Sequence, residues 1–97
     1  MSDEIDINSA IKKTRNLLFQ CQHLLPEDAV NQIEHYISHN EPEIAFEGLF
    51  IDLIKTGAFP ENIDKASCIE LGKQLKLNKE SVLKDEFWEE FIVFLKQ

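Results

Sequence analysis

The chain has 97 residues, of which 43% are hydrophobic, and a formal net charge of −8. This is enough for one domain with a single modest core. Two cysteines are too few for a disulfide framework, and no apolar run approaches the roughly 20 residues that span a bilayer. The negative charge repels phosphates and anionic membranes and favours cationic partners, so we expect no binding to nucleic acid or membranes.

The spacing of apolar residues is helical along nearly the whole chain. Only three glycines and three prolines interrupt it, and no alternating strand pattern competes. The predicted fold class is therefore all-α, a single compact bundle of five to six short helices over residues 1–97. Residues 1–7 are acidic and lack the basic stretch of a secretory signal, which predicts a flexible tail on a protein that stays in the cytoplasm.

The first helix is expected to begin at Asn8 or Ser9, because both side chains are good amino-terminal caps. Pro26 then suits the first turn of a second helix, which ends near Asn40. The apolar face of the first helix is formed by Ile11, Leu17, Leu18, Cys21, Leu24 and Leu25.

The third helix is expected at about 42–56, with Asn40 as its cap and Pro42 in its first turn. Gly57 suits a left-handed stop. Besides one broad apolar face, this helix has Ile44 and Ile51 on its other sides, so it should be central and contacted from two directions.

A fourth helix is expected from about Asp64 to Lys76, in which Gly72 allows close approach of a neighbour. A turn through Val82 and Leu83 leads to the last helix. Its inward side is predicted to carry Phe87, Trp88, Phe91, Ile92, Phe94 and Leu95.

Negative charge is concentrated in residues 16–54, which contain seven acids and neither lysine nor arginine. The flanking segments nearly cancel, with three acids and three bases in residues 1–15 and eight acids and seven bases in residues 55–97. A solvated surface normally mixes both signs, so the middle segment predicts a surface for a basic partner. The alternative is that the imbalance only aids solubility.

Motifs of catalysis are missing: there is no glycine-rich phosphate loop, C-x-x-C pair or nucleophile elbow. We therefore expect no enzyme activity and no cofactor. His35 and His39 have the spacing of two ligands on one helix face, but no third ligand is fixed by spacing, so no metal site is predicted. A metal- or pH-responsive regulator built on these histidines is the weakest alternative.

Two aromatic residues are candidates for binding. Phe19 lies opposite the apolar stripe of the first helix, and Tyr36 lies on the flank of the second. Each either packs under a neighbouring segment or serves as an apolar anchor in an interface, where aromatic residues often dominate the binding energy.

The segment EHYISHNEPEIAFEGLFIDLI at residues 34–54 resembles part of small bacterial immunity proteins, including those of the Maf type and of contact-dependent growth inhibition systems. The shared pattern is E-x-Y at Glu34 and Tyr36, followed by E-x-A-x-E-G-L from Glu43. It covers about a fifth of the chain. The remaining positions of the pattern are Ala45, Glu47, Gly48 and Leu49.

The resemblance implies a protein that neutralises the cationic C-terminal domain of a cognate toxin. That domain would be a nuclease, with a ribonuclease favoured, and inhibition would occur by occlusion of its active site. We expect the free protein to be monomeric. The alternative function is an acidic helical adaptor or regulatory subunit that binds a basic protein or peptide. The candidate partner-binding residues are Glu34, Tyr36, His39, Glu41, Glu43, Glu47, Asp52 and Phe19.

Overall fold

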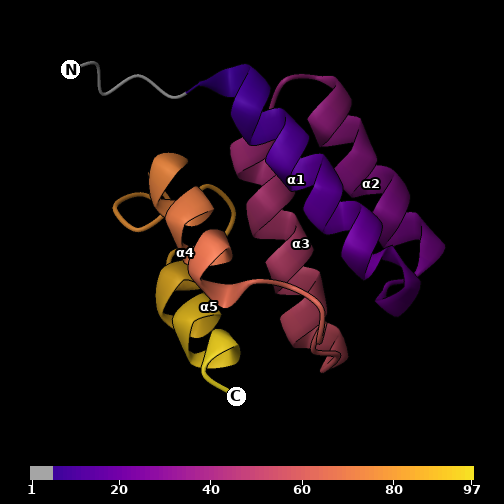
Figure 1. Ribbon diagram of the computed structural model, residues 1–97, viewed down its shortest axis with the longest axis vertical. Coiled ribbons are helices and arrows are strands. Elements are labelled where there is room, and N and C mark those ends of the chain that lie inside the picture. Colours follow the sequence, from indigo (N-terminus) through magenta and orange to yellow (C-terminus); the bar gives the residue numbers. More distant parts are fainter. Residues whose placement is uncertain (1–5) are drawn as a thin grey trace.

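The computed structural model describes residues 6–97, which fold into five α-helices and one 3₁₀ turn with no strand in that range. This confirms the prediction of a small all-α bundle. None of the described helices is long and apolar enough to cross a membrane. The elements in chain order are α1 (Ile7–Cys21), η1 (Gln22–Leu24), α2 (Glu27–Ser38), α3 (Pro42–Thr56), α4 (Lys65–Gln74) and α5 (Phe87–Leu95) (Figure 1).

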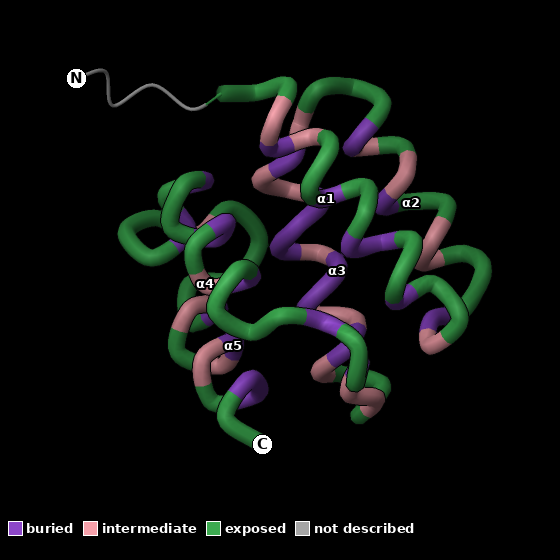
Figure 2. Tube along the Cα trace, in the orientation of Figure 1, coloured by how far each residue is buried: buried purple, intermediate pink, exposed green. Residues whose placement is uncertain are grey.

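Helix α3 is the centre of the bundle, as predicted. It contacts α1 and α2 on one side and α5 on the other (Figure 1), and buried positions recur along its length (Figure 2). Gly57 ends it at φ 76°, where a left-handed residue lets the backbone N–H reach the carbonyl of Leu53 at 2.9 Å. Its buried apolar side chains are Ala45, Phe46, Leu49, Phe50 and Leu53.

The first helix begins earlier than expected. Asp6, rather than Asn8 or Ser9, is the cap, and its Oδ1 accepts a hydrogen bond from the Ser9 backbone N–H at 3.2 Å. Asp6 and Ile7 thus belong to the start of α1, which corrects the predicted tail over residues 1–7. Residues 1–5 of that tail lie outside the described range.

The Trp88 side chain of α5 packs directly against Gly72 of α4. A Cβ atom built there would lie 2.7 Å from Cζ3 of Trp88, a distance that no real Cβ tolerates. The predicted role of Gly72 is therefore confirmed. Lys76 has a φ of 64°, so α4 ends at Gln74, shortly before the predicted limit.

An aromatic cluster fills the space between α3 and α5. The ring centroids of Phe50 and Phe91 are 4.8 Å apart, and Phe87 stacks on Phe91 at 5.5 Å.

The two cysteines are buried and unpaired. Burial raises the pKa of Cys21 to about 11 and that of Cys68 to about 12, the latter also because Cys21 is nearby. Both thiols therefore act as small apolar groups.

Candidate functional site

Glu47 is fully buried in the centre of α3, where its carboxylate is held entirely by backbone groups. Oε1 accepts a hydrogen bond from the N–H of Val82 at 2.8 Å, and Oε2 accepts two, from Leu83 and Lys84, each at 2.7 Å. Three successive backbone N–H groups form a concavity that suits an anion. In this fold no partner can reach the side chain, so Glu47 is removed from the predicted binding surface.

A signal for this burial was present in the sequence. Glu47 directly follows the buried Phe46 and lies in a helix that is apolar on two sides. A charge at such a position must find hydrogen-bond donors inside the protein. What the local sequence did not indicate is that segment 82–84 supplies them.

Four of the predicted residues come together around the turn between α2 and α3. The carbonyl of Tyr36 accepts hydrogen bonds from the backbone N–H groups of His39 at 3.2 Å and Glu41 at 2.9 Å. Tyr36 is half-buried against the core, His39 is exposed, and Glu41 and Glu43 are half-buried. Neither Glu41 nor Glu43 forms an ion pair with any residue that the structure describes. We call these four residues the turn cluster.

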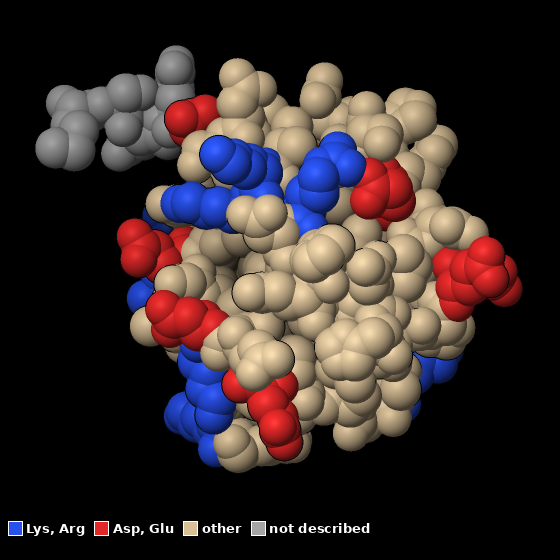
Figure 3. Space-filling view, turned by 45° about the vertical axis from the view of Figure 1, so that its right-hand side comes forward, with Lys and Arg blue, Asp and Glu red and all other residues tan. Residues whose placement is uncertain are grey.

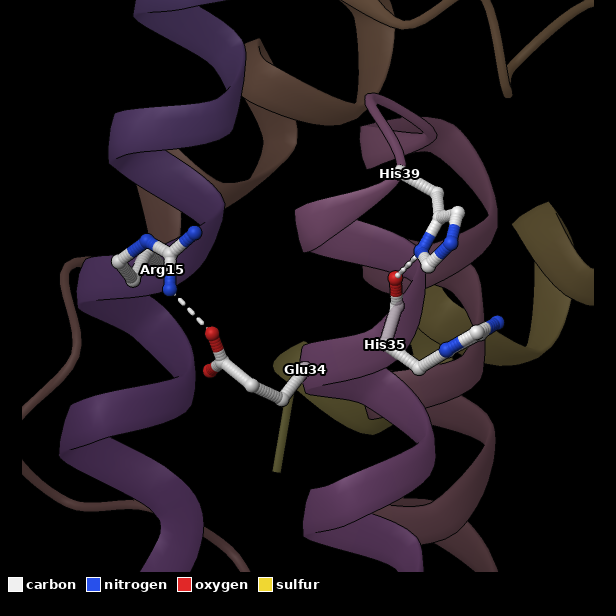
Figure 4. Close-up of polar contacts among 4 residues, drawn as sticks. All are labelled: Arg15, Glu34, His35 and His39. Atoms are coloured by element: carbon white, nitrogen blue, oxygen red, sulfur yellow. Dashed lines mark hydrogen bonds and ion pairs between the residues drawn. The ribbon is translucent and has the colours of Figure 1, made fainter.

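Glu34 lies on a different side of α2. Its carboxylate pairs with Arg15 of α1, and both side chains remain roughly half exposed (Figure 4). An exposed pair of this kind contributes at most about 1 kcal/mol to stability. Part of the charge of Glu34 is therefore compensated within the protein.

His35 and His39 stand side by side on the outward face of α2, with ring centroids 4.1 Å apart (Figure 4). Nδ1 of His39 donates a hydrogen bond to the backbone carbonyl of His35 at 2.8 Å, because a carbonyl oxygen can only accept. Within residues 6–97 no group of three or more His, Cys, Asp or Glu side chains could hold a metal ion. The structure thus brings no third ligand to this pair.

The last two predicted residues lie apart from the turn cluster. Phe19 is 72% exposed on α1, one turn after Arg15, and no loop within residues 6–97 covers it. Asp52 is half-buried near the carboxyl end of α3, where burial raises its pKa and Lys55 partly offsets that rise. The eight predicted residues therefore do not form one surface.

Charge on the molecule is distributed in patches of both signs. Figure 3 shows basic side chains gathered in the upper part of one face and acids in separate groups rather than in one continuous area. Helix α1 contributes three exposed bases, Lys12, Lys13 and Arg15. The charges of residues 55–97 nearly cancel when they are summed. Within this range, however, residues 80–90 carry five acids and one base.

Comparison of the chain with protein-family models, curated proteins and solved structures gave no match. The functional argument therefore depends on the residues themselves.

Proposed function

We propose that the protein binds a basic protein partner through the turn cluster, and that this partner is the cationic toxin domain of an immunity pair. The observation that carries the proposal is the state of Glu41 and Glu43. Both acids follow the exposed His39 closely in the chain, and neither is paired with a base in the described part of the chain. Lysine or arginine side chains of a partner would supply the missing counter-charges.

The position of these acids also holds them in a defined arrangement. Glu41 precedes α3 and Glu43 lies in its first turn, where the helix dipole stabilises negative charge. Partial burial restricts both side chains, so binding would cost little conformational entropy. Tyr36 would contribute apolar contact at the same place, a role in which tyrosine is common.

The toxin is favoured over other basic proteins because the resemblance to immunity proteins falls on residues 34–54, which include the whole turn cluster. Nucleases that bind phosphate need cationic clefts, and an acidic helical surface complements such a cleft. Occlusion of that cleft would neutralise the toxin. The acidic adaptor predicts the same contacts without inhibition, so growth and binding must be measured separately.

The experiment is to express the C-terminal domain encoded by the gene just upstream, with and without this protein, and to follow growth. We expect rescue by the wild type and its loss in the Glu41→Lys, Glu43→Lys variant. The matched control is Glu61→Lys, Glu70→Lys, which makes the same change in charge at two exposed sites outside the turn cluster. Thermal melting of both variants establishes that each is folded.

Equal rescue by the two variants would exclude the turn cluster as the binding surface. A wild type that fails to rescue but still binds the expressed domain in a pull-down would exclude immunity against that toxin and favour the adaptor.

A further inference from the structure

The loop that Glu47 holds presents apolar side chains to solvent. Val82 is 48% exposed and Leu83 51% exposed, although the backbone of both is fixed by the buried carboxylate. Removing a carboxylate from water is unfavourable, and the three hydrogen bonds are needed to offset it. The arrangement gives two exposed apolar residues a fixed backbone conformation.

Leu83, which lies against Gly48 of α3, and the neighbouring Lys84 border a furrow between α3 and α5. Two hollows of about 250 and 340 Å³ lie along it and share Ile54 and Glu90 as lining residues. At one end, a methyl carbon of Leu83 lies 3.8 Å from the position that a Cβ of Gly48 would take. At the other end Val93 is 65% exposed. We call the apolar set the α3–α5 furrow; it consists of Gly48, Ile51, Ile54, Leu83 and Val93.

The charges around the furrow leave an excess of acid. Lys84 is paired with Glu90, with its Nζ 3.0 Å from Oε1 and 2.8 Å from Oε2. The other bordering base, Lys55, is close enough to Asp52 to act on its pKa. Glu86 and Glu89 are exposed and form no ion pair with any described residue. A ligand of the furrow would thus meet an apolar floor with an acidic border.

Glu90 lines both hollows. Both of its carboxylate oxygens lie near the Lys84 ammonium, so its charge is compensated within the protein.

We propose that the α3–α5 furrow binds an amphipathic helix whose apolar stripe is bordered by lysine or arginine, and that Glu47 is the positioning residue that preforms its 82–84 wall. A furrow between two packed helices accepts a third helix through side chains spaced three and four residues apart. The basic border follows from the excess acids Glu86 and Glu89. This surface is distinct from the turn cluster and does not depend on the toxin assignment.

The probe is a fluorescein-labelled synthetic Leu/Lys peptide of about 18 residues, five turns of amphipathic helix. A Leu/Glu peptide with the same apolar pattern is the charge control. We expect the Leu/Lys peptide to bind the full chain in fluorescence anisotropy and the Leu/Glu peptide not to bind. In amide NMR spectra, the shifts caused by the Leu/Lys peptide should be concentrated in residues 48–54, 82–84 and 89–93.

Variants test the furrow itself. Val93→Lys should weaken binding by about tenfold or more, the loss of a substantial anchor. Phe19→Lys is the matched control, because it places the same charge at an equally exposed apolar site on α1, and it should change binding less than about twofold. Glu47→Gln should weaken binding while the amides of residues 82–84 exchange faster with solvent. Leu83→Ser tests the same wall without changing the buried carboxylate.

The proposal is overturned if both peptides bind equally, if the NMR shifts lie outside the furrow, or if Val93→Lys and Phe19→Lys weaken binding to the same extent. Sedimentation of the free protein adds one more test. A dimer that Val93→Lys dissociates would assign the furrow to a second copy of the chain and overturn the helix as its occupant.

Discussion

Oε2 of Glu47 lies 2.7 Å from the backbone nitrogen of Leu83, 36 residues further along the chain. Replacing Glu47 by alanine would leave three backbone N–H groups without their acceptor and create a cavity where the buried side chain was. We expect Glu47→Ala to lower the free energy of unfolding by about 3–5 kcal/mol in urea denaturation. Glu47→Gln, which keeps one acceptor oxygen, should cost less. Equal losses for Glu47→Ala and the half-buried Glu43→Ala would contradict the structural role of this carboxylate.

Two glycines should respond to alanine in opposite directions. At Gly72 the new Cβ would meet Trp88 at 2.7 Å, so Gly72→Ala should destabilise the fold by about 1–3 kcal/mol. At Gly48 the nearest atom is 3.8 Å away, an ordinary contact, and the substitution should stabilise the middle of α3 by about 0.5–1 kcal/mol. Thermal or urea denaturation of both variants provides the measurement. A Gly72→Ala variant that is as stable as the wild type would mean that Trp88 does not pack against Gly72 as described.

The helix spans could be read from the sequence because their signals are local. Pro42 and Gly57 bracket α3, and the spacing of its apolar residues showed that it is central. The predicted start of α1 was wrong because several neighbouring side chains can cap a helix, and the residue that does so is Asp6. The prediction was also wrong where the deciding contact is distant, because the environment of Glu47 is made by residues that no pattern in α3 specifies.

The candidate site was less predictable than the fold for a similar reason. Charge summed along the sequence does not state which side chains face the same way, and Glu34 and Glu47 are each compensated by residues of other segments. The net charge of a sequence segment such as residues 16–54 therefore overstates the negative charge that is available to a partner.

Both cysteine thiols should be unreactive while the protein is folded. Burial raises the pKa of Cys21 to about 11 and that of Cys68 to about 12, and only the thiolate reacts rapidly. A chromogenic disulfide reagent at neutral pH should label neither residue in the native protein and both in denaturant. Rapid labelling of either thiol in the native state would contradict its burial.

The same shifts set a limit on stability at high pH. Since the folded-state pKa values lie above the ordinary value of 9.0, the unfolded chain releases these protons first. The contribution of both thiols is complete below about pH 9 and is lost as the pH rises above it. The Cys21→Ala, Cys68→Ala variant should show a shallower decline of unfolding free energy above about pH 9 than the wild type. If the unfolding free energies of the two proteins fell in parallel above about pH 9, the thiols would make no such contribution.

Asp64 should contribute to stability in the opposite pH range. Its carboxylate accepts hydrogen bonds from the Ser67 hydroxyl at 2.7 Å and the Ala66 N–H at 3.1 Å, and these bonds lower its pKa. The contribution is therefore present above the unfolded pKa of about 4 and is lost as the pH falls through the lower folded value. Asp64→Ala should melt at a lower temperature than the wild type at neutral pH, with the difference narrowing in acid. Ser67→Ala should reproduce part of this pH-dependent difference in melting temperature.

The buried glutamate also affects the chain before folding is complete. As synthesis proceeds from the amino-terminal end, the apolar residues of α3 emerge well before residues 82–84 can cover Glu47. Until then its charge stays hydrated within a stretch that is otherwise rich in isoleucine, leucine and phenylalanine. A charge placed in this way opposes aggregation of the nascent segment. We therefore expect the Glu47 carboxylate to limit aggregation of the nascent chain before it becomes buried in the folded protein.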